Sequence, residues 1–303
     1  MSDSELHQDL MHAIYVTAFL LVADPSAQPA AEPAQAAVEE ADVERTRREE
    51  VARLAPAKAK QLEVLVAGRE PEKTEFVKAD LVKEPLLRWS NPTAGSVHGE
   101  VFVWSVEGRP AALASIFRWY HPFKDGTVEI VSLSQTAVMA RENGTVLWDS
   151  RRPGVSPAAI DGPAPAASKA GRLTQIRSLV RRFSAQLADK RSGEAVVRDL
   201  RLMNQPLHRY ENESHGIIDG AIFAVAEVTD PEVLVLIEAS KTDVSSGWRY
   251  ALARMNNHEL TVRLDDQVVQ SWPHIDRPWS DRKSTYTLFS FKPEDVKLGQ
   301  PAP

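Results

Sequence analysis

The sequence predicts an α+β, β-rich fold of two tandem duplicated modules, each a helix plus an antiparallel β-meander. Two features indicate it: an internal repeat, and a series of β-branched and aromatic runs separated by turn residues. Aligned with itself without gaps at an offset of 121 residues, the chain has 11 identities in the 36 positions from Leu81/Leu202 to Ile116/Ile237. Unrelated sequences of average composition give roughly two or three. The identical positions of the first copy are Leu81, Pro85, Leu86, Arg88, Asn91, Gly95, Gly99, Phe102, Pro110, Leu113 and Ile116.

Shifts in composition along the 303 residues predict the domain boundaries. In chain order we expect a signal peptide and leader (1–36), a helical or linker segment (37–61), a first β-rich module (62–150), a Pro/Ala/Gly linker (151–170), a helix plus the second β-rich module (171–291), and a disordered tail (292–303).

The N-terminal segment is typical of an export signal. Residues 13–23 form an apolar run of 11 residues, shorter than the roughly 20 residues that a stable membrane span needs. The residues before Met11 include three acids and no Lys or Arg, which is unusual for a secretory signal, so translation starts at either Met1 or Met11. We expect cleavage after Ala23 or Ala36, so that the mature chain begins between Asp24 and Ala37, and a soluble periplasmic or extracellular protein of bacterial type. The alternative is an N-terminal helix of a cytosolic protein.

Helices are expected before each meander. Residues 38–61 are rich in Ala, Glu and Arg, which are strong helix formers, but Pro56 interrupts them. A second helix is predicted where Leu173, Ile176, Val180, Phe183 and Leu187 recur at steps of three and four. The linker, with its many prolines, glycines and alanines, cannot sustain a helix or an interior strand and should form a long surface connection.

The strand predictions rest on runs bounded by turn signals. In the first module they are residues 100–106, 111–120 and 128–139, followed by a hairpin at Asn143-Gly144; in the second they are 221–227, 233–239, 248–255, 260–264 and 268–272. If the repeat is real, Phe102 and Phe223 should occupy equivalent inward positions, and Gly99 and Gly220 equivalent turns at the start of a strand.

Composition excludes several classes of function. The net charge is −6, of which five negative charges lie in residues 1–36, so the nearly neutral remainder lacks the basic surface of a nucleic-acid binder. The chain contains no cysteine, which removes disulfides, thiolate metal sites and cysteine nucleophiles. Phosphate-loop, dinucleotide, nucleophile-elbow and zinc-helix motifs are all missing. We therefore expect no cofactor and no metal.

The candidate catalytic residues are few and lie in the second module. His208, Glu211, His215 and Asp219 fall within twelve residues, but their spacing matches no metal template; exposed loop positions are the plainer interpretation. Glu238 interrupts an apolar strand, and a buried carboxylate has a raised pKa or requires a partner. Arg249 or Arg254 on the next strand could form a structural ion pair with it. We rank Glu238 first, followed by Asp219 and His208, and predict that Glu238→Gln abolishes binding or activity with little loss of thermal stability.

Aromatic residues on the strands are the other lead. Trp119, Trp248 and Tyr250 are the weak candidates for ligand binding, within a set that also includes Trp104, Tyr120, Trp272 and Trp279. Such a set could line a groove for a small molecule, a glycan or a peptide. Packing in the core of the sheet is the alternative.

Three segments are similar to a family of uncharacterised exported bacterial proteins: residues 84–92 (EPLLRWSNP), 200–210 (LRLMNQPLHRY) and 248–255 (WRYALARM). The resemblance covers about residues 81–291 and implies export and a shared β-rich fold. The family has no known activity, so no functional residue is transferred from it.

Two function classes remain after these exclusions. The favoured one is a non-catalytic exported binding or envelope-associated protein of unknown ligand, because no clustered acid, base and nucleophile is visible. The alternative is an exported hydrolase or metal-dependent enzyme with its site in the second module. Convergence of the candidate side chains in a concave pocket would favour the enzyme.

Overall fold

The computed structural model describes residues 33–68, 75–190, 193–241 and 246–298. The expected core of the export signal, residues 13–23, lies outside these ranges. Within them the α-helices are α2 (Pro33–Gln61) and α3 (Lys169–Val180), and two 3₁₀ turns, η1 (Glu213–His215) and η2 (Pro293–Asp295), accompany them. No described helix has both the length and the apolar character needed to cross a membrane.

Strands make up most of the described chain. Before α3 come β1 (Glu63–Ala67), β2 (Phe76–Lys78), β3 (Asp80–Leu81), β4 (Leu87–Ser90), β5 (Ser96–Val106), β6 (Arg109–His121), β7 (Gly126–Ser132), β8 (Val138–Glu142), β9 (Thr145–Ser150) and β10 (Ala158–Ile160). After it come β11 (Phe183–Asp189), β12 (Val196–Leu202), β13 (His208–Asn212), β14 (Ile217–Glu227), β15 (Asp230–Lys241), β16 (Ser246–Arg254), β17 (Glu259–Leu264), β18 (Gln267–Trp272) and β19 (Tyr286–Phe291).

These strands form three antiparallel sheets, which confirms the β-rich, antiparallel character of the prediction. One sheet has the order β2-β1-β8-β9. A six-stranded sheet runs β19-β7-β6-β5-β3, with β4 also paired to β5. A nine-stranded sheet runs β10-β16-β15-β14-β12-β11-β17-β18, with β13 also paired to β14.

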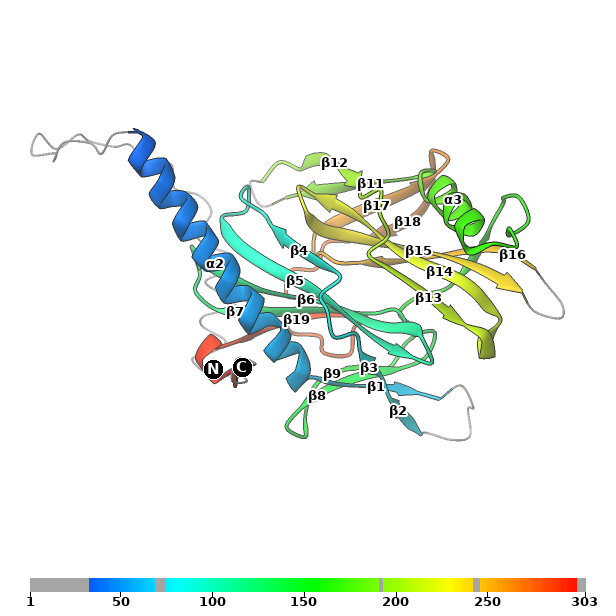
Figure 1. The fold of residues 1–303 in the computed structure, drawn as a ribbon, viewed down its shortest axis with the longest axis horizontal. Helices are drawn as coiled ribbons and strands as arrows, with labels where there is room; N and C mark the ends of the chain where they lie inside the picture. The colour runs from blue at the N-terminus through cyan, green and yellow to red at the C-terminus, as the bar shows by residue number, and fades with distance from the viewer. Residues whose placement is uncertain (1–32, 69–74, 191–192, 242–245, 299–303) are drawn as a thin grey trace, which may run out of the picture.

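The core has three layers, and the middle one joins the two larger sheets. Helix α2 packs over β5 and β6 around Phe102, and α3 packs over β14 and β15 around Phe223; both phenylalanines are fully buried (Figure 1). Between the sheets lies a layer that we call the central seam, built from apolar side chains of β4–β7 and β13–β16. The long strands β5, β6, β14 and β15 are therefore buried on both faces, which explains their nearly continuous apolar sequence.

The Asn143-Gly144 hairpin is confirmed. It joins β8 to β9, and both residues have positive φ, 49° and 82°, as the favoured two-residue hairpin turn requires. The prediction for Gly99 and Gly220 is wrong, because neither lies in a turn. Both lie inside strands, beneath aromatic rings: a Cβ atom at Gly99 would lie 2.4 Å from the indole of Trp89.

The predicted second helix is too long. Helix α3 ends at Val180, and Phe183 and Leu187 lie in β11, where burial alternates residue by residue. A spacing of four residues fits one face of a helix, but it is also an even number and therefore fits one face of a strand. Sequence periodicity alone could not separate the two.

The expected linker and tail contain more structure than their composition indicates. Residues 158–160 form β10, which pairs with the edge of β16; an edge position suits a strand that cannot be interior. Residues 286–291 form β19, which pairs with β7 of the six-stranded sheet rather than continuing the second module. Val296, in the expected tail, is buried.

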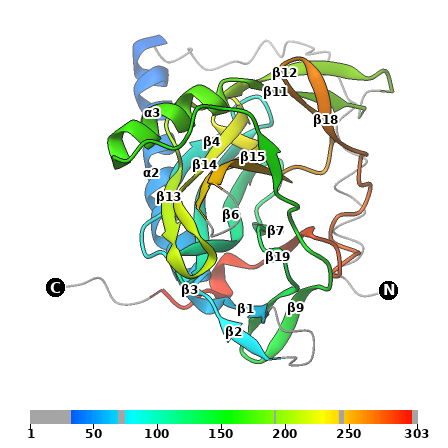
Figure 2. The ribbon, with the colours of Figure 1, turned by 90° about the vertical axis from the view of Figure 1, so that its right-hand side faces the viewer.

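Helix α2 continues past Pro56 to Gln61, and its C-terminal half is the part that packs on the sheets. Val51 is buried there, whereas Val38 and Val43 are exposed. Accordingly, the first turns of α2 extend beyond the sheets (Figures 1 and 2).

Candidate functional site

Two cavities lie near opposite ends of β5 and β6. One is near the β5–β6 turn; the other is near the opposite end of β6. We call the second one the acidic cavity. It has a volume of about 570 Å³, within the usual range of small-molecule sites.

The acidic cavity has an aromatic wall. It is formed by Trp89 of β4, by Phe117 and Trp119 of β6, and by Phe123. The ring of Phe117 lies between those of Trp89 and Trp119, with centroid distances of 5.4 and 6.3 Å, and Phe123 meets Trp119 edge to face at 5.6 Å. The indole Nε1 of Trp89 donates to Ser115 Oγ at 2.9 Å, which holds the ring over Gly99. The wall is therefore ordered before any ligand binds.

Three carboxyl groups stand in the same cavity: Glu129 of β7, and Asp230 and Glu232 of β15. Glu129 and Glu232 are buried and Asp230 is partly buried. Burial raises the pKa of Glu129 to about 7 against an opposing hydrogen bond from Tyr286. Burial also raises the pKa values of Asp230 and Glu232, and repulsion among the three carboxylates adds to this. Their mutual influence shows that the groups lie close together.

Little cationic charge is available to these carboxyl groups. None of the three forms an ion pair within the described part of the chain, and Glu232 Oε2 is buried without a hydrogen-bond partner. Arg254 is nearby and lowers the pKa of Glu129, but its guanidinium donates to three backbone carbonyls, those of Asn256, His258 and Pro273.

The remaining charged groups of the acidic cavity are largely engaged elsewhere. Glu227 pairs with Arg198 at 2.9 Å, and Lys190 pairs with Glu259 at 2.6 Å. The amide of Asn91 lies 3.4 Å from Asp230 Oδ2 and approaches as a weak donor.

Two imidazoles complete the polar side of this cavity. The rings of His258 and His274 lie 5.6 Å apart, and each is within reach of a carboxylate: Asp189 for His258 at 3.9 Å and Asp276 for His274 at 3.4 Å.

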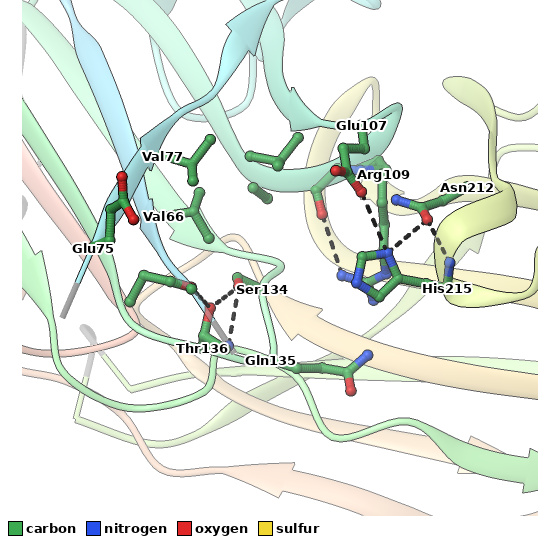
Figure 3. Close-up of a pocket in the computed structure, with 15 residues that line it drawn as sticks. Val66, Glu75, Val77, Glu107, Arg109, Ser134, Gln135, Thr136, Asn212 and His215 are labelled. Atoms are coloured by element: carbon green, nitrogen blue, oxygen red, sulfur yellow. Dashed lines mark hydrogen bonds and ion pairs between the residues drawn. The ribbon is translucent and has the colours of Figure 1, made fainter. Parts of the chain in front are cut away.

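The second cavity, which we call the arginine pocket, has a volume of about 440 Å³ and is shown in Figure 3. Arg109, the first residue of β6, lines it beside Asn212, the last residue of β13, and His215 of η1. Its Nε donates to Glu238 Oε1 at 3.0 Å, and the phenol of Tyr210 donates to the same oxygen at 2.8 Å. The positive charge that borders this pocket is thus compensated inside the protein.

Glu238, the first-ranked sequence candidate, therefore belongs to an ion pair that crosses the central seam. Its side chain is only 5% exposed. The partner is Arg109 from β6, not Arg249 or Arg254 from the neighbouring strand, because the Glu238 side chain points toward the other sheet. Glu238 lines neither cavity.

Asp219 and His208 do not converge with Glu238. Asp219 is buried against α3, where it accepts hydrogen bonds from Arg172 at 3.0 Å and from Arg209. His208 lies on β13, its ring stacked 6.2 Å from that of Tyr210, and burial lowers its pKa. Neither lines one of the two cavities. In the described residues no three His, Asp or Glu side chains are arranged to hold a metal ion.

The aromatic candidates separate into two environments. Trp119 lines the acidic cavity. Trp248 is buried beneath α3 and donates its indole N–H to the carbonyl of Pro163 at 2.7 Å, and Tyr250 packs 5.1 Å from Phe183. Core packing therefore accounts for these last two.

Neither a family model, nor a curated protein, nor a solved structure matches this chain.

Sequence reasoning missed Glu129, Asp230 and Glu232. The signal was present, since Glu129 interrupts Val128-Glu129-Ile130-Val131 just as Glu238 interrupts its own strand. Glu129 lies about a hundred residues before Asp230 and Glu232, however, and only the fold, in which β7 contacts β16 next to β15, brings them together.

Proposed function

We propose that the protein is a non-catalytic, exported binding protein that holds a small ligand in the acidic cavity. The observation that carries the proposal is the combination, in one cavity of about 570 Å³, of a pre-ordered aromatic wall with carboxyl groups that have no internal ion-pair partner. Ligand sites typically combine apolar walls with a few convergent polar groups. Buried polar groups without partners are otherwise destabilising.

Tryptophan substitution tests the proposal. A mixture of small aromatic amines, alcohols and acids is screened against the full chain by saturation-transfer NMR, and hits are titrated against Trp119→Ala. The matched control is Trp272→Ala, which removes another half-buried tryptophan that lines neither cavity. We expect at least tenfold weaker binding to Trp119→Ala and unchanged binding to Trp272→Ala. Equal effects of the two substitutions, or no hit at all, would contradict a ligand site here.

Export is the second part of the proposal, and sequence alone supports it. The apolar run of residues 13–23 and the absence of cysteine suit a periplasmic or extracellular protein. N-terminal sequencing of protein isolated from its native host should find a first residue between Asp24 and Ala37. An intact start at Met1 or Met11 on cytosolic protein would contradict export.

We also propose that the two halves arose by tandem duplication. In β4–β5, Trp89 lies opposite Gly99; in β13–β14, Tyr210 lies opposite Gly220. Both rings cover their glycines, with a hypothetical Cβ at 2.4 Å and 2.5 Å from the ring atoms. The two pairs are related by the same offset of 121 residues.

The turns that follow support the same proposal. The side-chain oxygen of Asn91 accepts the backbone N–H of Ala94, and that of Asn212 accepts the N–H of His215. Superposing residues 72–150 on 193–271 of an experimental structure tests the duplication. Phe102 and Phe223 must then fall on the same face of corresponding strands.

An exported hydrolase remains the second candidate, because one observation favours it. The raised pKa values of Glu129, Asp230 and Glu232 would let one carboxyl group act as a general acid near neutral pH. Chemical turnover of a bound ligand, lost in Glu232→Gln, would establish this candidate. Recovery of the ligand unchanged after prolonged incubation would favour the binding protein.

A further inference from the structure

The internal repeat pairs residues near one cavity with residues of the other. At the offset of 121 residues, Arg109 corresponds to Asp230, and Glu238 corresponds to Phe117. Near the arginine pocket, Arg109 and Glu238 neutralise each other at 3.0 Å. In the acidic cavity the corresponding positions hold a carboxyl group and an aromatic ring.

A second difference adds a carboxyl group to the acidic cavity. Ala111 of the arginine pocket corresponds to Glu232, whose side chain is buried and whose Oε2 has no hydrogen-bond partner. Glu129 on β7 faces the same space. The acidic cavity therefore has the negative half of a buried ion pair but not the positive half.

We propose that the ligand of the acidic cavity is an organic cation, an ammonium group attached to an apolar or aromatic body. This inference rests on the proposed binding function and specifies its ligand class. The ammonium group would lie against Glu232, Asp230 and Glu129, where it supplies the missing positive charge. The apolar body would lie against Phe117 and Trp119.

The aromatic wall suits such a ligand in two ways. The faces of tryptophan and phenylalanine rings carry negative electrostatic potential and attract cations. The same rings would bury the apolar part of the ligand. A hydrated metal ion has no such part, so this contact favours an organic amine over a metal ion. Ammonium groups also donate up to three hydrogen bonds, which matches the unpartnered Glu232 oxygen and its neighbours.

A charge series on one molecular frame tests the inference. The probes are 2-phenylethylammonium, the neutral 2-phenylethanol, the anionic phenylacetate, and calcium ion alone. Dissociation constants are measured at pH 8 by isothermal calorimetry and NMR titration on the full chain. We expect the ammonium to bind at least tenfold more tightly than the alcohol, and phenylacetate to show no binding.

Glu232→Gln should weaken binding of the ammonium at least tenfold and leave binding of the alcohol within twofold. The matched control is Glu213→Gln, which removes an exposed carboxylate that lines neither cavity; binding of the ammonium should stay within threefold. Circular dichroism checks the fold of each variant. Glu129→Gln repeats the test if Glu232→Gln does not fold.

The outcomes separate this inference from the proposed function. If the alcohol or phenylacetate binds as tightly as the ammonium, the ligand class is wrong and the binding function stands. Binding of calcium ion without the ammonium also overturns the ligand class, in favour of a metal site. If no probe binds at all, both proposals fail.

Discussion

Raising the pH from 5 to 8 is predicted to lower the free energy of unfolding, and Glu129 is one cause. Burial raises the pKa of this carboxyl group from its ordinary 4.5 to about 7. At a pH between 4.5 and about 7, Glu129 keeps a proton in the folded protein that it has released in the unfolded chain. Because the folded state then binds more protons, the contribution of Glu129 to stability is complete below about pH 4.5 and is lost as the pH rises through about 7.

The size of the effect follows from the two pKa values of Glu129. Each pH unit over which folded and unfolded states differ by one proton changes the free energy of unfolding by about 1.4 kcal/mol. For Glu129 the total is about 3 kcal/mol. Asp230 and Glu232, whose pKa values are also raised, add to the fall with the same sign.

Urea denaturation at pH 5, 6, 7 and 8 measures this dependence in the wild-type chain and in Glu129→Gln. The variant cannot ionise at this position, so its free energy of unfolding should fall less between pH 5 and pH 8, by about 2.5 kcal/mol. Glu213→Gln, an exposed position in η1, controls for the loss of one carboxylate. Parallel curves for wild type and Glu129→Gln would refute the reasoning, because the group would then titrate alike in both states.

Three further predictions concern the central seam and the glycine beneath Tyr210. Arg109→Met should lower the free energy of unfolding by roughly 3–5 kcal/mol, because it leaves the Glu238 charge buried and unpaired. Adding Glu238→Leu should restore most of this loss. A double variant no more stable than Arg109→Met would contradict the prediction. Glu238→Gln should accordingly lower the melting temperature and leave ligand binding intact, the reverse of the expectation from sequence, and a calorimetric scan with a ligand titration distinguishes the two. Gly220→Ala should lower the free energy of unfolding by roughly 1–3 kcal/mol, because the new Cβ would lie 2.5 Å from the Tyr210 ring. Gly247→Ala, which has open space at its Cβ, should lower it by under about 0.5 kcal/mol. Equal losses in urea denaturation would show that contact with the ring is not the cause.

The long strands were predictable because their signal is local. Turn residues bound β5, β6, β14 and β15, and the runs between them are β-branched and apolar. The Asn143-Gly144 turn fixes its hairpin through backbone conformation alone. Short elements gave no such signal: β4 has four residues, and only Trp89 among them is buried.

The acidic cavity was less accessible to sequence reasoning, because it depends on contacts between distant residues. Trp119 was among the candidates, but the acids beside it come from β7 and β15. Glu238 illustrates the difficulty, since its position within an apolar strand has the same sequence signature as that of Glu129. Only the position of Arg109 across the seam shows which of the two carboxylates has its charge compensated by an ion pair.

The central seam also bears on ancestry. On the duplication proposed above, a protein with one copy of the repeat would have exposed the face that now forms the seam, and would have needed a second identical chain to cover it. In such a symmetric dimer every substitution appears twice, so that both ends of the interface must share one chemistry. Fusion of two genes removes this constraint. One end of the seam now has Arg109 with Glu238, and the other has Asp230 with Phe117. Two ends can differ in this way only when both copies belong to a single chain.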